Sequence, residues 1–210
     1  AVGYDPAQLD ALPAACAASF TGAGNPQAAV ELGPSEKLLD LGCGAGLDLC
    51  LYARRFGTPQ RLAGLDGSRL MVATATENLI DAGFGDTEVF CTRAETIPLP
   101  EGHLDVVTAN GIFNLSPDEH AVMAEIARVL KPGGRLCFAE IVLAEEIEEQ
   151  VRTSIDDWFR CIGGAMLQDE LISNLQQHGF EQVEIISTGR NARTGHAASR
   201  CAVVRAVRGA

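Results

Sequence analysis

The sequence predicts an α/β fold whose mostly parallel, seven-stranded sheet contains one antiparallel strand. Apolar segments of strand length alternate with amphipathic segments of about 10–15 residues, which is the pattern of βαβ units. A glycine-rich turn follows the first apolar segment, and residues 188–199 alone connect the last two. A connection this short, without helical periodicity, favours an antiparallel hairpin over a parallel crossover. Residues 1–36 precede the alternation and are predicted to form a helical cap on a domain of residues 37–210.

Each element follows from local hydrophobic pattern and end signals. The predicted strands are Lys37–Gly42, Arg61–Asp66, Thr87–Thr92, Leu104–Ala109, Arg135–Val142, Glu181–Ser187 and Arg200–Arg208. The predicted helices are Leu47–Phe56, Ser68–Ala82, a segment opened by Ser116, Glu145–Cys161 and Leu167–His178. Ser68 and Ser116 are the predicted N-caps of their helices, with Pro117 in the first helical position.

Composition excludes several functional classes. The chain has 210 residues and is 47% apolar, which is enough to bury a core. Its formal net charge of −12 repels phosphate backbones and anionic membrane surfaces. Neither nucleic acid nor a membrane is therefore expected as a partner. The first twenty residues lack a basic start and are not expected to be a secretory signal. The seven cysteines include no C-x-x-C pair, which predicts reduced thiols in a cytoplasmic protein rather than disulfides or a zinc site.

The strongest motif is the turn Asp40–Gly46, DLGCGAG, between a predicted strand and a predicted helix. The dinucleotide pattern G-x-G-x-x-G needs a glycine at position 47, which is Leu47 here, so a pyrophosphate ligand is disfavoured. Asp40 would repel a phosphate but suits a ligand with an ammonium and a sulfonium group. Asp66 ends the second strand, where a carboxylate can accept both ribose hydroxyls. An ordinary glycine-rich turn and a helix N-terminal acid are the alternatives.

These motifs carry a family resemblance. DLGCGAG, GLDGS, the fourth strand and LKPGGRL, from about Lys37 to Phe138, resemble the class I methyltransferases that use S-adenosyl-L-methionine (SAM). Four further segments resemble the arsenite methyltransferase family: GYDPAQLDALP, GAGNP, NGIFNLSPDEH and WFRCIGGAM. The resemblance implies a Rossmann-like class I fold, SAM as cofactor and a small-molecule methyl acceptor.

The resemblance also implies roles for single residues, with the cofactor across the carboxyl ends of the first strands. Asp40, Gly42 and Gly44 would hold the methionine portion, Asp66 the ribose and Met71 the adenine.

The loop after the third strand departs from the family pattern. Arg93 stands where the family has an acid for the adenine amino group, although the Ala94 N–H group can still contact the ring. Asn110, after the fourth strand, would lie beside the reactive methyl group.

The thiols that arsenic chemistry requires are mostly missing. At three of the four family cysteine positions this sequence has Ala23, Leu49 and Gly111. Cys161 alone remains, and a single thiol cannot chelate trivalent arsenic. Cys50 follows position 49, but one helical step rotates a side chain by about 100°. Arsenite methylation would therefore need Cys16, Cys50 or Cys91 to converge on Cys161.

The predicted acceptor pocket lies between the N-terminal cap, Asn110–Asn114, Glu140 and Trp158–Met166. Asn110, Glu140 and Cys161 are its candidate catalytic residues. Glu140 could be a general base or a solvated carboxylate, and Cys161 could contact the acceptor or pack under a glycine turn. Three functions stay open: methyl transfer to a small organic acceptor, methyl transfer to arsenite or another metalloid through an altered thiol set, and SAM binding without methyl transfer.

Overall fold

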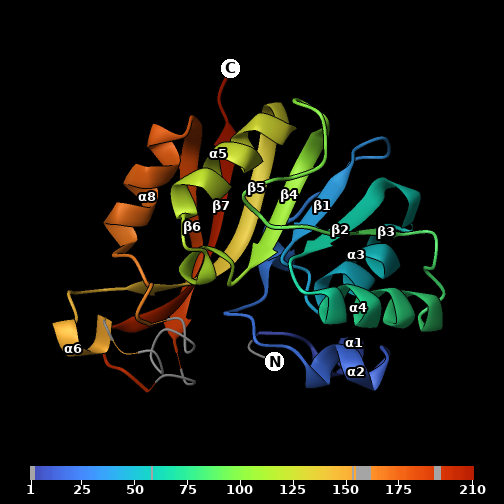
Figure 1. Cartoon of the computed structure of the whole chain (residues 1–210), viewed down its shortest axis with the longest axis horizontal. Coiled ribbons are helices and arrows are strands. Elements are labelled where there is room, and N and C mark those ends of the chain that lie inside the picture. The colour runs from blue at the N-terminus through green and yellow to red at the C-terminus, as the bar shows by residue number, and fades with distance from the viewer. Residues whose placement is uncertain (1–2, 58, 153, 155–161, 192–194) are drawn as a thin grey trace.

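The computed structural model describes residues 3–57, 59–152, 154, 162–191 and 195–210. Within them, one sheet has the strand order β3-β2-β1-β4-β5-β7-β6 (Figure 1). Its strands are β1 (Leu38–Leu41), β2 (Leu62–Asp66), β3 (Glu88–Cys91), β4 (Leu104–Asn110), β5 (Leu130–Leu143), β6 (Phe180–Arg190) and β7 (Ser199–Arg208). Strands β1 to β5 pair in parallel, and β7 is antiparallel to both β5 and β6. The predicted mostly parallel, seven-stranded sheet with one antiparallel strand is confirmed.

Helices cover both faces of this sheet. They are α1 (Pro6–Asp10), α2 (Ala14–Ala18), α3 (Leu47–Phe56), α4 (Arg69–Asp81), α5 (Glu119–Val129), α6 (Glu149–Arg152) and α8 (Gln168–Gln177), with short 3₁₀ turns η1 (Pro26–Ala29), η2 (Pro59–Arg61) and η3 (Phe113–Leu115). None of the helices in the described part of the chain is long and apolar enough to cross a membrane.

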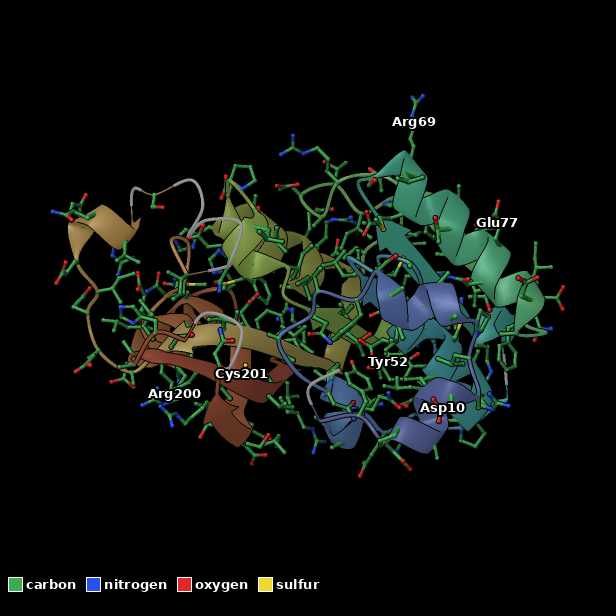
Figure 2. All side chains as sticks on the ribbon, turned by 90° about the horizontal axis from the view of Figure 1, so that it is seen from below. Asp10, Tyr52, Arg69, Glu77, Arg200 and Cys201 are labelled. Carbon is green, nitrogen blue, oxygen red and sulfur yellow. The ribbon has the colours of Figure 1, made fainter. Side chains whose placement is uncertain are left out.

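Strand alternation divides the core into two clusters. Leu39 and Leu41 of β1 pack on one face with side chains of α5 and α8. Leu38 packs on the other face with side chains of α3, α4 and the N-terminal segment. Tyr52 of α3 is fully buried in this second cluster, whereas Arg69 and Glu77 project outward from α4 (Figure 2). Helices α1 and α2 thus pack on the sheet through α3 and α4.

The strand order reverses at β1, which has β2 on one side and β4 on the other. In open parallel sheets, such a reversal leaves a crevice beyond the carboxyl ends of the strands, where ligands bind. Asp40, Asp66 and Asn110 all lie at the carboxyl ends of these three strands. The topology therefore brings three of the predicted site residues to one edge.

Two local predictions are wrong. Helix α5 begins at Glu119, not at Pro117, because Asp118 is the N-cap and accepts the Ala121 N–H group. The Ser116 hydroxyl instead donates to Glu95 at 2.8 Å. The predicted helix from Glu145 is not helical before Glu149. Four glutamates within residues 145–149 would repel each other along a single helical turn.

Candidate functional site

The glycine turn after β1 folds back against β2. Gly42 and Gly44 have φ values of 72° and 54°, the left-handed region that favours glycine. A Cβ atom on Gly42 would lie 2.7 Å from Cδ1 of Ile112, whereas one on Gly44 would meet nothing within 4 Å. Asp66 accepts the Gly44 N–H group at 2.9 Å. The backbone at Gly44 therefore borders open space while the Asp66 carboxylate fixes its orientation.

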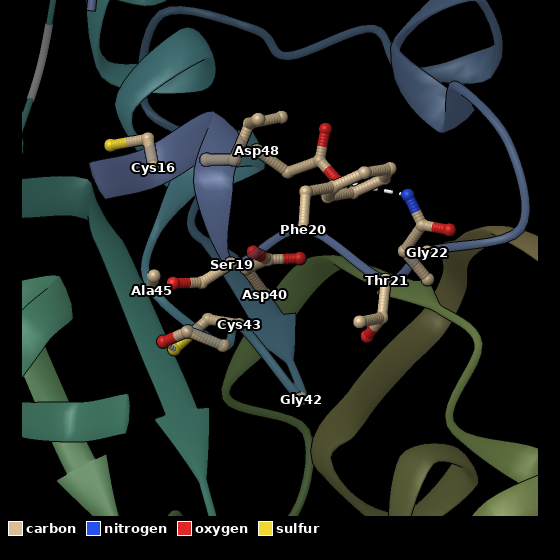
Figure 3. A pocket seen from close by; sticks show the side chains of 13 residues that line it. Cys16, Ser19, Phe20, Thr21, Gly22, Asp40, Gly42, Cys43, Ala45 and Asp48 are labelled. Carbon is tan, nitrogen blue, oxygen red and sulfur yellow. Dashed lines mark hydrogen bonds between the residues drawn. The ribbon is translucent and has the colours of Figure 1, made fainter. Parts of the chain in front are cut away.

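A cavity of about 50 Å³ beside this turn is acidic, and we call it the acidic cavity. It is lined by Cys16, Ser19, Phe20, Thr21, Gly22, Asp40, Gly42, Cys43, Gly44, Ala45, Leu47, Asp48 and Asn110. Figure 3 shows Ser19, Phe20 and Thr21 beside Asp40 and Asp48. None of these lining residues carries a positive charge.

The two carboxylates of the acidic cavity are almost completely buried, Asp40 at 3% exposure and Asp48 at 5%. Burial raises the pKa of Asp48 to about 6, although hydrogen bonds from Tyr4 and Asn110 oppose the shift. Burial, and then the nearby charge of Asp48, raise the pKa of Asp40 as well. Two buried acids without a basic partner among the lining residues give this cavity a negative character that would favour a cationic ligand.

Asn110 fastens the N-terminal segment over the acidic cavity. Its Oδ1 atom accepts the N–H groups of Ala23 (2.8 Å) and Gly24 (3.3 Å). Its amide group donates to the Gly24 carbonyl (2.8 Å), to Tyr4 Oη (3.0 Å) and to Asp48 Oδ2 (3.0 Å). Tyr4 in turn donates to Asp48 Oδ1 at 2.7 Å. The cap, β4 and α3 therefore meet at one side chain.

Sequence reasoning missed Tyr4 and Asp48. The available signal for Asp48 was an acid placed between Leu47 and Leu49 at the start of a predicted helix. The first seven residues of this helix, Asp48 included, are buried. Such a residue needs partners, and here it has Tyr4 and Asn110.

A second cavity of about 310 Å³ adjoins the first, because Gly42 lines both; we call it the slot. Its walls are mainly apolar, and it is lined by Gly42, Leu65, Asp66, Gly67, Arg93, Ala94, Glu95, Ile112, Leu115, Ser116 and Pro117. Asp66 projects from the end of β2, and besides Gly44 it accepts the Ser68 N–H group at 2.8 Å. The slot thus combines a mainly apolar lining with an oriented carboxylate.

Glu95 is the second carboxylate of the slot and was not predicted. Arg93 donates to both of its oxygens at 3.2 Å, and Ser116 donates to Oε1 at 2.8 Å. Hydrogen bonds from Arg93 lower the pKa of Glu95 to about 2, so it stays ionised. Arg93, at the expected position of an acid, therefore orients an acid two residues further along.

The other predicted residues are distributed unevenly. Ala94 lines the slot, whereas Met71 is a half-buried residue of α4 outside the described lining of both cavities. Glu140 is 1% exposed, so the alternative of a solvated carboxylate is wrong. Its carboxylate accepts the N–H groups of Phe113 in η3 and Ile141 in β5, and burial raises its pKa to about 7. Cys161, with much of the predicted wall Trp158–Met166, lies outside the described residues.

The thiols form one close pair. Cys16 of α2 and Cys50 of α3 are fully buried, and their interaction lowers the pKa of the Cys16 thiol and raises that of the Cys50 thiol. Cys16 also lines the acidic cavity. Cys91 is exposed at the end of β3. The predicted convergence on Cys161 stays a prediction. Within the described ranges, no group of three or more His, Cys, Asp or Glu residues is placed to hold a metal ion.

Comparison with known proteins identifies the class. The family profile described as "Methyltransferase domain" matches residues 32–185, which is most of the chain. The chain therefore belongs to the methyltransferase domain family, as its motifs predicted, and its fold is the Rossmann-like class I methyltransferase fold.

Relatives within this class are named arsenite methyltransferases. The protein of Halobacterium salinarum is 34% identical over 164 residues, covering 78% of this chain and 42% of that protein. The human protein is 33% identical over 153 residues, covering 68% and 40%. The chain thus spans less than half the length of these curated relatives. The crystal structure of CrArsM, an arsenic(III) SAM methyltransferase from Chlamydomonas reinhardtii, superposes with a TM-score of 0.79 at 23% identity, covering 97% of this chain and 72% of that one.

Proposed function

We propose that the chain binds SAM across the acidic cavity and the slot and transfers its methyl group to a small-molecule acceptor. The single observation that carries this proposal is the pair of buried carboxylates, Asp40 and Asp48, joined through the Gly42 turn to a slot bearing Asp66. A cationic amino-acid portion, a ribose diol and a flat base follow one another in SAM in the same order. No other common nucleoside cofactor places positive charge where this site places two acids.

The residues fit the cofactor group by group. Asp40 and Asp48 would hold the ammonium and sulfonium charges, which would favour the ionised forms of both carboxylates. The N–H groups of Gly44 and Ser68 hold the Asp66 carboxylate. Because a carboxylate has about four acceptor sites, two sites remain that could accept the two ribose hydroxyls. Ala94 and Glu95 would border the base, and Glu95 would accept a hydrogen bond from its exocyclic amino group. Met71 was predicted to pack against the adenine, and it stays a proposal because it does not line the slot.

Cofactor entry requires the N-terminal segment to move. A cavity of about 50 Å³ has room for a few water molecules but not for an amino-acid chain. Ser19–Gly22 line this cavity on the side of the N-terminal segment. The adjoining Ala23 and Gly24 donate their N–H groups to Asn110, which holds this segment in place. The cap therefore opens to admit the cofactor and closes over it, which excludes water from the reacting atoms.

The cofactor supplies a methyl group already activated by the positive charge on its sulfur. The protein's part is to orient that sulfonium, through Asp40, Asp48 and the Gly42–Gly44 backbone, toward the acceptor. Asn110 lies at this edge of the sheet and holds the cap, so we assign it the task of closing the site beside the methyl group. Cys161 remains our proposed acceptor contact.

A metalloid acceptor is the second candidate function. The observation that favours it is the Cys16–Cys50 thiol pair, since Cys16 borders the acidic cavity. The relatives named arsenite methyltransferases point the same way.

SAM binding without methyl transfer is the third candidate function. The net charge of −12 supports a small-molecule acceptor over nucleic acid, and thiol usage supports a cytoplasmic location.

Calorimetry with SAM, followed by an assay for S-adenosylhomocysteine (SAH) over a panel of acceptors that includes arsenite, tests the proposal. Binding together with SAH formation is the expected result. Absence of both heat and thermal stabilisation with SAM would overturn it, and binding without turnover on any acceptor would favour the third function. Turnover with arsenite that is lost in Cys16→Ser or Cys161→Ser, while SAM binding is retained, would establish the metalloid acceptor.

A further inference from the structure

We propose that Glu140 is a positioning residue: its buried carboxylate gathers the backbone N–H groups of the turn after β4 and so fixes the wall of the slot. This inference rests on the proposed function, because it assigns Glu140 to the cofactor site. It replaces the role of general base that the sequence suggested for this residue.

Backbone N–H groups from two segments of the chain donate to the Glu140 carboxylate. Oε2 accepts the Phe113 N–H group and Oε1 accepts the Ile141 N–H group, both at 2.9 Å. The neighbouring backbone N–H groups of Ile112 and Asn114 also favour its ionised form, which opposes the effect of burial on its pKa. A carboxylate has about four acceptor sites, so it can accept the Phe113 and Ile141 N–H groups and still have capacity for further donors. In its ionised form this buried carboxylate anchors the donating segment.

The segment anchored in this way borders the proposed cofactor site. Ile112 and Leu115 line the slot, and the Ile112 side chain lies against Gly42, so closely that a Cβ atom there would be 2.7 Å away. Additional bonds tie the same turn to β5: the Asn114 side chain donates to the Ile141 carbonyl at 2.7 Å, and the Gly111 N–H group donates to Ala139 at 2.9 Å. Glu140 thus holds the wall that faces the glycine turn.

A base must reach the proton that it removes, directly or through one water molecule. Glu140 is 1% exposed and lies outside the described lining of both cavities, and its oxygens point at backbone donors instead. The geometry therefore allows it to act on the site through the turn, not by proton transfer.

Glu140→Gln tests this role, because the amide keeps the shape of the side chain but turns one acceptor into a donor facing N–H groups. We expect SAH and adenosine to bind at least about tenfold more weakly, since buried donors lose their partner. Amide hydrogens of residues 112–114 should exchange faster. The matched control is Glu145→Gln, an exposed glutamate at the same end of β5, which should leave both affinities unchanged.

Dissociation constants are measured well below the unfolding transition of each variant. A merely structural Glu140 would lower the transition temperature without changing either constant, and a general base would lower kcat with SAH affinity intact; each result overturns the proposal. If Glu140→Gln does not fold, Glu140→Asp retains the charge but retracts it, and the same loss of adenosine affinity is expected. Wild-type protein that fails to bind SAH would refute the proposed function itself, which distinguishes the two failures.

Discussion

Replacing Glu95 by glutamine probes the recognition of the base. Oε1 of Glu95 accepts hydrogen bonds from Arg93 and Ser116, whereas Oε2 accepts one from Arg93 at 3.2 Å. A lone pair on Oε2 is therefore available to the adenine amino group. In Glu95→Gln the carbonyl oxygen is drawn to Arg93, and the amide N–H₂ group then faces the adenine amino group, donor against donor.

The magnitude follows from the type of contact. Hydrogen bonds to charged groups contribute about 1.5–3 kcal/mol, which corresponds to a roughly 10- to 150-fold change in the dissociation constant. The side chain of Glu95 is 17% exposed, which places the effect toward the lower end of that range. We therefore expect SAH to bind about 10- to 30-fold more weakly to Glu95→Gln.

Calorimetry with SAH and with its analogue lacking the 6-amino group completes a thermodynamic cycle. Wild-type protein should prefer SAH by about the factor above, and Glu95→Gln should bind the two ligands almost equally. Glu101→Gln, at an exposed position shortly after the same loop, should behave like wild type. A Glu95→Gln variant that retained the wild-type preference for SAH would refute the assignment, because the amino group would then be recognised elsewhere.

Three further predictions concern the rest of the site. Asp66→Ala should lose SAM affinity with its circular dichroism spectrum intact; unchanged calorimetric binding would remove Asp66 from the ribose site. Gly22→Ala should lower the free energy of unfolding in urea by about 1–3 kcal/mol, because its Cβ would lie 2.5 Å from Asn110 Oδ1. The control Gly189→Ala, whose Cβ would meet nothing within 4 Å, should lower it much less. Equal losses in the two variants would show that the cap is not held at Gly22. The pKa of Asp48 is raised to about 6 in the folded protein, so protonation of this carboxyl group favours folding. The free energy of unfolding should therefore rise as pH falls through about 6. SAM affinity should decrease over the same interval, because the protonated group no longer attracts a cation. Asp48→Asn should reduce the pH dependence of both quantities, and Glu140, whose pKa is raised to about 7, should supply part of the stability change that remains. An unaltered SAM profile in that variant would assign the titration to another group.

Sequence reasoning placed several candidate residues at one edge of the sheet. Asp40 and Asp66 were predicted from the glycine-rich turn and from the acid that ends the second strand, and parallel strands end at a common edge. Asn110 and Ala94 were predicted from the family resemblance. These residues all lie within two positions of a strand end or in a short loop, where local pattern fixes position.

The missed residues depend on long-range packing. Tyr4 contacts Asp48 and Asn110 across 44 and 106 positions of sequence, a separation that no local pattern reveals. Glu95 was missed because the sequence does not show which of several neighbouring polar side chains faces a cavity. Burial decided Glu140 in the same way, since the end of a strand is compatible with either a solvated or an enclosed carboxylate.

The amide of Asn110 acts toward Ala23 and Gly24 much as a further peptide group would, because it presents a carbonyl oxygen and an N–H₂ group in opposite directions. An aspartate there would set a second negative oxygen against Asp48 and the Gly24 carbonyl, and a leucine would leave both partners unsatisfied. Positions 48 and 110 are consequently expected to vary as a pair, so that an acid can be tolerated at 110 only when the acid at 48 has become an amide.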